Sequence, residues 1–189
     1  MVADNIRIFA EAAAAADELA AGLSKLSRFV ADTAGRGTEE IHWSTARELS
    51  KRTYYSRDTS LWIGAAPRAR TTLAEIMAEP TSQDWDLVST SVAGTWHQID
   101  RLALDLKREN EKFSYRPLFG GLIKSLQTNA PILQTVPMAQ PQSADELVAA
   151  KDFLTRYAIL VDEICTLHEA VGAYVDRLKS DGKWPIRGD

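Results

Sequence analysis

Apolar residues in the last third of the chain keep an unbroken helical spacing. Ser143 is followed three residues later by Glu146, a capping box in which both side chains satisfy free backbone donors at a helix start. Side chains then recur every three or four residues at Leu147, Ala150, Leu154, Tyr157, Val161, Ile164, His168, Val171, Val175 and Leu178. A second line repeats every seven residues, at Phe153, Leu160, Leu167 and Tyr174. The combined stripe is about 120° wide, which predicts a long helix packed against at least two others.

Two earlier segments have the same periodicity. One runs from Ile6 to Thr33 and stops at the Gly-Arg-Gly of residues 35–37; the other runs from Trp85 to Leu106 and opens at Thr81. At 1.5 Å per residue, the three helices would each be roughly 45 to 55 Å long. The sequence therefore predicts an all-α fold, an elongated bundle of at least four helices, three of them long. We expect residues 1–189 to form a single domain.

The sequence pattern determines the secondary structure of the segments between these helices less clearly. Residues 38 to about 55 have a helical pattern, and Pro67 suits the first turn of a short helix that ends before Pro80. The pattern does not decide whether residues 54–66 are helix or loop. Residues 117–142 hold four prolines and two adjacent glycines, which predicts an irregular connection with no long helix. Apolar residues at helical spacing within it predict that the connection packs onto the bundle, and residues 181–189 are expected to form a C-terminal tail.

Composition excludes several classes of protein. A hydrophobic content of 45% with 25% charged residues is ordinary for a globular protein. The longest apolar runs, such as residues 157–161, are far shorter than the roughly 20 residues that cross a bilayer. The first residues carry neither a basic nor an apolar targeting region, and the lone Cys165 cannot form an internal disulfide. We therefore expect a cytoplasmic protein without a membrane partner.

Charge is segregated along the chain. The net charge is −4, but residues 47–70 carry six basic and two acidic side chains, a net +4. Residues 107–124 carry five basic and two acidic side chains, a net +3, which leaves −11 for the remainder. Such asymmetry is evidence about binding partners rather than about the fold.

The two basic segments also hold aromatic residues. Arginine offers paired donors to phosphate or carboxylate, and aromatic rings offer faces on which bases stack. If residues 47–57 are helical, Arg47, Lys51 and Tyr55 share a face. The candidate binding residues are Arg47, Lys51, Arg52, Tyr54, Tyr55, Arg57, Trp62, Arg68, Arg70, Lys107, Arg108, Lys112 and Arg116. The alternative is that these cations pair with acids and aromatic rings of the chain itself.

Catalytic motifs are missing from the sequence. It contains no phosphate-binding glycine loop, no nucleophile elbow, no C-x-x-C and no complete H-E-x-x-H. His42, His97 and His168 fall on three predicted helices, but His97 points about 155° away from its apolar stripe. We therefore predict no catalytic residue, metal site or cofactor.

Three hypotheses of function remain. The first is a non-enzymatic helical subunit or adaptor whose basic segments bind a polyanion such as a nucleic-acid backbone, or an acidic protein partner. Its partner would be another protein, a second copy of the chain or a nucleic acid. The second is a metal- or small-molecule-dependent bundle enzyme with buried His42 and His168. The third is an immunity- or antitoxin-like module that binds a protein through its acidic surface.

Overall fold

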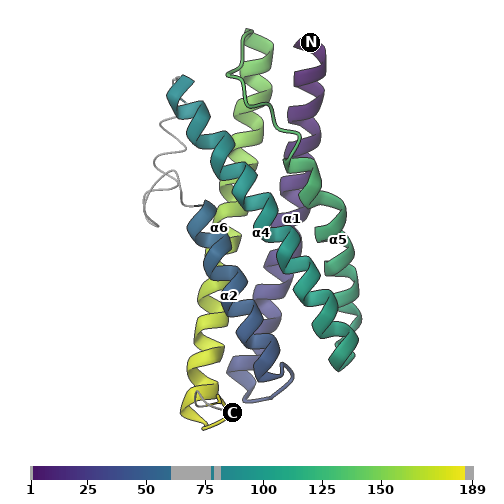
Figure 1. The fold of residues 1–189 in the computed structure, drawn as a ribbon, viewed down its shortest axis with the longest axis vertical. Coiled ribbons are helices and arrows are strands. Elements are labelled where there is room, and N and C mark those ends of the chain that lie inside the picture. The colour runs from purple at the N-terminus through teal and green to yellow at the C-terminus, as the bar shows by residue number, and fades with distance from the viewer. Residues whose placement is uncertain (1, 61–77, 79–81, 186–189) are drawn as a thin grey trace.

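The structure is a bundle of parallel and antiparallel helices. The computed structural model describes residues 2–60, 78 and 82–185. Within these residues the helices are α1 (Val2–Arg36), α2 (Trp43–Ser60), α4 (Ser82–Phe113), α5 (Pro117–Leu133) and α6 (Ala144–Ser180). Figure 1 shows that α1, α4 and α6 run in one direction and that α2 and α5 run back. The predicted all-α bundle is confirmed.

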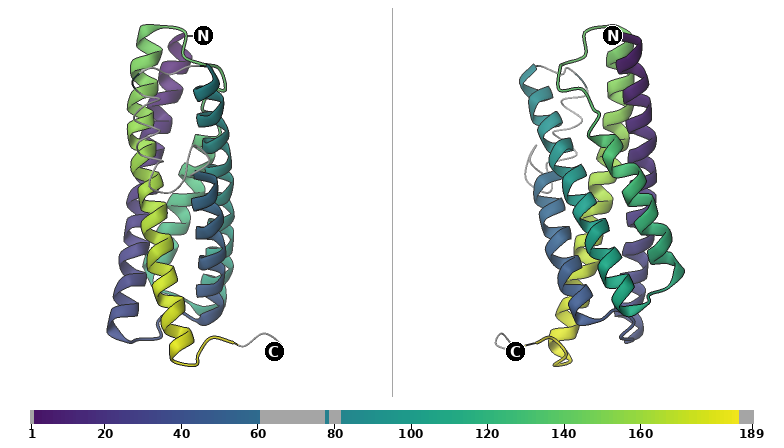
Figure 2. Two further views of the ribbon diagram at one scale, coloured as in Figure 1. Left: turned by 90° about the vertical axis from the view of Figure 1, so that its left-hand side faces the viewer. Right: turned by 45° about the vertical axis from the view of Figure 1, so that its right-hand side comes forward.

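The helices form a closed ring around one apolar core. Going around it, α1 packs on α6, α6 on α2, α2 on α4, α4 on α5 and α5 on α1. The side views show the elongated shape, with the two ends of the chain at opposite ends of the bundle (Figure 2). Large aromatic side chains fill the centre: the Phe9 ring meets the Trp85 ring edge to face with centroids 5.7 Å apart, and both residues are buried.

Helix α6 follows the predicted pattern. Ser143 Oγ accepts the backbone N–H of Glu146 at 3.1 Å, and Glu146 Oε2 accepts the N–H of Gln142 at 2.6 Å. The residues of the seven-residue repeat are all buried. Because α6 packs on both α1 and α2, the prediction of at least two partner helices is confirmed.

Helix α2 begins later and ends later than the sequence pattern predicted. Residues 38–42 are not helical, because His42 takes the capping position: its carbonyl accepts the Ala46 N–H at 3.0 Å and its Nδ1 accepts the Ser44 N–H at 3.2 Å. The helix then continues to Ser60, so residues 54–60 are helical. The short helix predicted from Pro67 to Pro80 lies, apart from residue 78, outside the described residues.

The prediction that residues 117–142 contain no long helix is wrong. Helix α5 covers 17 of them. Pro117 stands at its first position, where a missing N–H costs nothing, and Pro131 stands in its last turn. The expectation that this segment packs onto the bundle is correct, since its apolar residues Phe119, Leu122, Ile123 and Leu126 are buried. Residues 134–143 form the non-helical remainder.

None of the helices in the described ranges is both long enough and apolar enough to be a candidate membrane span.

Candidate functional site

The outer face of α2 carries part of the predicted basic segment. Ala46, Leu49 and Thr53 point into the bundle, so Arg47, Lys51, Tyr54 and Tyr55 remain exposed on the opposite side. Tyr54 is 54% exposed and Tyr55 is 44% exposed. Their rings meet edge to face with centroids 5.6 Å apart.

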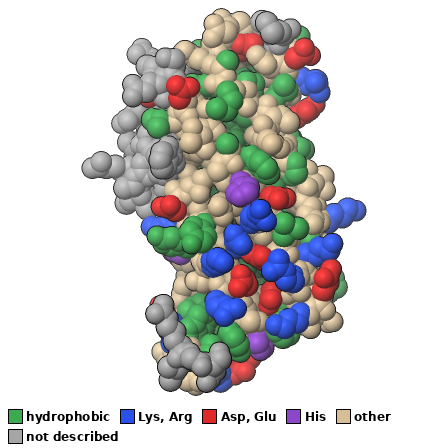
Figure 3. All heavy atoms as spheres, in the orientation of Figure 1, with side chains coloured by type: hydrophobic (Ala, Val, Ile, Leu, Met, Phe, Trp, Pro, Cys, Tyr) green, Lys and Arg blue, Asp and Glu red, His purple; other side chains and the backbone are tan. Residues whose placement is uncertain are grey.

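Packing of α2 on α4 brings the second basic segment beside the first. Arg108 and Lys112 are exposed on α4, and so is Arg101, which lies seven and eleven residues before them on the same side of the helix. Figure 3 shows Lys and Arg side chains gathered where α2 and α4 face the viewer. We define the basic face as Arg47, Lys51, Arg101, Arg108 and Lys112. Lys107 is also exposed, but it lies about 100° around α4 from Arg108, outside this face.

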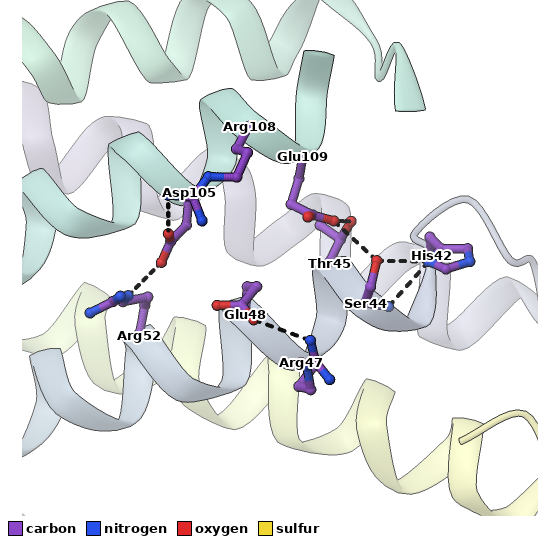
Figure 4. Close-up of polar contacts among 9 residues, drawn as sticks. All are labelled: His42, Ser44, Thr45, Arg47, Glu48, Arg52, Asp105, Arg108 and Glu109. Carbon is purple, nitrogen blue, oxygen red and sulfur yellow. Dashed lines mark hydrogen bonds and ion pairs between the residues drawn. The ribbon is translucent and has the colours of Figure 1, made fainter. Parts of the chain in front are cut away.

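A buried carboxylate joins the two helices beneath the basic face. Asp105 Oδ2 accepts the Arg52 Nε–H at 2.5 Å, and Asp105 Oδ1 lies 3.7 Å from Arg108 Nη2 (Figure 4). The Asp105 side chain is 8% exposed and that of Arg52 is 20%, whereas that of Arg108 is 74%. Arg52 therefore stabilises the α2–α4 contact, while Arg108 remains available at the surface. One carboxylate faces two guanidinium groups, which leaves a surplus positive charge.

Several of the candidate cations have partners within the chain. Arg47 lies 3.6 Å from Glu48 and over the Trp43 ring, and Lys112 lies over the Phe113 ring. Arg116 is at the end of the bundle, paired with Glu40 and stacked over Phe29, and is not part of the basic face. Across the part of the chain that the structure describes, no ion pair or aromatic contact involves Lys51, Arg101 or Lys107.

Arg57 points toward α6 rather than outward. It lies beside Cys165 and His168, where its charge acts on both groups. Burial raises the pKa of the Cys165 thiol more than Arg57 lowers it, so the thiol stays protonated at neutral pH. Burial, and then Arg57, lower the pKa of His168, which is therefore neutral at pH 7.

The histidines are far apart. His168 Nδ1 lies 3.2 Å from Thr53 Oγ1, whereas His42 precedes α2, eleven residues earlier. At 1.5 Å per residue this separates them by roughly 16 Å along the helix. His97 is exposed, as its position on the helix predicted. No group of three or more His, Cys, Asp or Glu side chains suited to a metal occurs among the described residues.

His42 is held in a polar network at the start of α2. The donors form one chain: the His42 N–H donates to Tyr115 Oη at 3.1 Å, the Tyr115 hydroxyl to Thr45 Oγ1 at 2.5 Å, and the Thr45 hydroxyl to Glu109 Oε2 at 2.6 Å. Ser44 Oγ bridges Glu109 Oε2 and His42 Nδ1 at 3.2 and 2.8 Å (Figure 4).

The sequence reasoning missed one residue of the basic face. Arg101 lies seven residues before Arg108, a spacing that places two side chains on the same side of a helix, but it fell outside the segment chosen by local charge. Trp62, Arg68 and Arg70 lie outside the described residues. Comparisons with protein-family models, with curated proteins and with solved structures found no match.

Proposed function

We propose that this protein is a non-enzymatic helical-bundle subunit that binds a polyanion, the backbone of a single-stranded nucleic acid, through the basic face. The observation that carries the proposal is the packing of α2 on α4, which places exposed cations from two separate segments side by side. A group of exposed cations neutralises phosphates and releases their counterions.

The charge balance of the surface supports this assignment. Asp105 is shared between Arg52 and Arg108, so its single negative charge cannot neutralise both. Lys51 and Arg101 add charge with no ion pair to the described residues. The chain outside the two basic segments carries a net −11, so an anionic polymer is repelled elsewhere and directed to this face.

Two exposed rings adjoin the cations. Tyr54 and Tyr55 stand three and four residues after Lys51, within one helical turn of it. Base stacking on such rings contributes about 1–3 kcal/mol per base in single-strand binders and tolerates any base sequence. The combination of backbone charge and stacking faces favours single strands over duplexes, whose bases are already stacked.

Neutralising the basic face tests the proposal. The variant Arg47→Gln, Lys51→Gln, Arg108→Gln removes three exposed charges, and the matched control Lys25→Gln, Arg28→Gln, Lys179→Gln removes three exposed charges elsewhere. Arg52 and Arg57 are left intact because both are partly buried. Binding to a fluorescent single strand of about 20 nucleotides is measured by anisotropy.

The outcome distinguishes a nucleic-acid backbone from an acidic protein partner. Three lost contacts at a slope of about 0.7 each predict a loss of about 100-fold in affinity at about 0.1 M salt for the basic-face variant, with the control close to wild type. Equal losses in both variants would mean that only net charge matters. No binding to nucleic acid, together with capture of an acidic protein that the basic-face variant loses, would assign the face to a protein partner instead.

A further inference from the structure

A cavity of about 640 Å³ opens at the end of the bundle opposite the N-terminus. There α1 and α6 end, α2 begins, and the chain turns from α4 into α5. The walls come from the α1–α2 connection, the α4–α5 turn and the end of α6. This volume falls within the range of about 300–1,000 Å³ typical of small-molecule sites. The cavity is separate from the basic face, whose cations do not line it.

Aromatic rings form one side of the cavity. The His42 ring stacks on Phe113 with centroids 4.4 Å apart and planes inclined by 25°, and it lies 5.4 Å from the Trp43 ring. All three residues line the cavity, together with Phe29. Flat faces grouped in this way favour a planar ring as the occupant, through stacking and burial of apolar surface.

The polar network holds the His42 ring in place. Its Nδ1 lies 3.2 Å from the Ser44 backbone nitrogen and 2.8 Å from Ser44 Oγ. Ser44 and Thr45 are in turn held by the buried Glu109. The His42 ring is therefore a rigidly held part of the aromatic side of the cavity.

Two cations line the same cavity. Arg116 pairs with Glu40, and Lys183 pairs with Glu39. The Arg116 and Lys183 side chains are 55% and 45% exposed. Both side chains of the Lys183–Glu39 pair are exposed, so the pair contributes about 0–1 kcal/mol to stability, whereas Glu40 is only 26% exposed. An anionic group on a ligand can therefore replace Glu39 on Lys183 at small cost, and Arg116 would bind it through the N–H donors that Glu40 does not use.

We propose that this cavity binds a small planar aromatic anion, a ring bearing a carboxylate or a phosphate. The ring stacks against the His42, Phe113 and Trp43 side, and Arg116 binds the anionic group. The ligand class follows from the coexistence of flat apolar faces and cations in one cavity.

Four probes test separately whether the ligand needs an aromatic ring and whether it needs a negative charge. 1-Naphthoate and 1-naphthyl phosphate carry the same ring and a charge, and differ in whether the anion is a carboxylate or a phosphate. Cyclohexanecarboxylate carries the charge without the ring, and 1-naphthalenemethanol carries the ring without the charge. Binding of each to the full chain is measured by isothermal titration calorimetry, and saturation-transfer NMR locates the bound ring.

The variants are chosen to keep the fold. Arg116→Gln removes a side chain that is more than half exposed, and Arg101→Gln on the basic face is the matched control, since Arg101 is exposed and does not line the cavity. A charge-assisted hydrogen bond predicts that Arg116→Gln weakens the charged aromatic probes about tenfold and leaves 1-naphthalenemethanol unchanged. Whichever of the two anions binds more tightly identifies the anionic group.

Several results would overturn the proposal. Cyclohexanecarboxylate binding as tightly as 1-naphthoate would remove the role of the aromatic side, and equal effects of Arg116→Gln and Arg101→Gln would place the ligand elsewhere. Absence of binding by both charged aromatic probes at millimolar concentration would reject the site altogether.

Discussion

Removal of the Asp105 carboxylate should destabilise the protein and strengthen polyanion binding at the same time. In Asp105→Asn, Arg52 loses its charged partner although its own side chain is only 20% exposed. Breaking a fully buried ion pair costs about 3–5 kcal/mol and an exposed pair about 0–1 kcal/mol. The partial access of Arg52 to water places this pair between them, at about 2 kcal/mol, which for a chain of this size lowers the Tm by about 4–8 °C.

Arg108→Gln is the matched comparison for the loss of stability in Asp105→Asn. Arg108 lies 3.7 Å from the same carboxylate, but its side chain is 74% exposed, so we expect a loss below about 0.5 kcal/mol. Urea unfolding followed by circular dichroism gives both values. A double-mutant cycle that combines Asp105→Asn with Arg52→Met should give a coupling energy of about 1–2 kcal/mol.

Asp105→Asn should strengthen binding of the single strand although it lowers the stability of the protein. Asp105→Asn removes the negative charge beneath the basic face, so affinity for the single strand should rise a few-fold at constant salt. The reasoning about this contact would be refuted if Asp105→Asn matched wild type in stability, or if Arg108→Gln cost as much as Asp105→Asn. Weaker binding by a folded Asp105→Asn variant would contradict the electrostatic account.

Two further predictions concern the interior of the bundle. A Cβ at Gly94 would lie 2.0 Å from Thr59 Cγ2, whereas a Cβ at Gly121 would meet nothing within 4 Å. In urea unfolding, Gly94→Ala should therefore destabilise the protein by about 2 kcal/mol, and Gly121→Ala should stabilise it by about 0.5–1 kcal/mol. Equal effects of the two substitutions would exclude a close approach of α2 to α4. Burial raises the pKa of Tyr157 to about 12, so its contribution to stability is complete below about pH 10 and is lost as the pH rises from there to about 12. Tyr157→Phe should reduce the loss of stability at high pH, and the remainder is due to Tyr115 and Tyr174, whose pKa values burial also raises. A Tyr157 that ionises together with the exposed tyrosines, seen at 295 nm in the folded protein, would contradict it.

Helical periodicity was sufficient to predict the fold class and the long helices. The apolar stripe predicted which side of α6 is buried, because apolar residues that recur with the helical period lie on one face of an amphipathic helix and that face packs against the core. The extent of α5 was mispredicted because Pro117 and Pro131 were treated as breakers. Pro117 stands in the first turn, where its missing N–H has no intrahelical partner to lose, and Pro131 stands in the last turn, so the hydrogen bond it removes lies at the end of the helix.

The candidate site was predictable only in part. Local charge identified Arg47, Lys51 and Arg108, but it could not distinguish them from Arg52, which differs only in pointing toward α4. That distinction depends on which helices are neighbours, and this follows from tertiary packing rather than from local pattern. The end cavity was not predicted, because its lining comes from the ends of helices that are far apart in the sequence.

The salt dependence of nucleic-acid binding tests the central proposal most directly. With five cations on the basic face and a slope of about 0.7 per contact, log K against log salt should fall with a slope of about −3.5 for wild type. For Arg47→Gln, Lys51→Gln, Arg108→Gln the slope should be about −1.4. A wild-type slope near zero, or the same slope in both proteins, would contradict the assignment of the basic face to a polyanion.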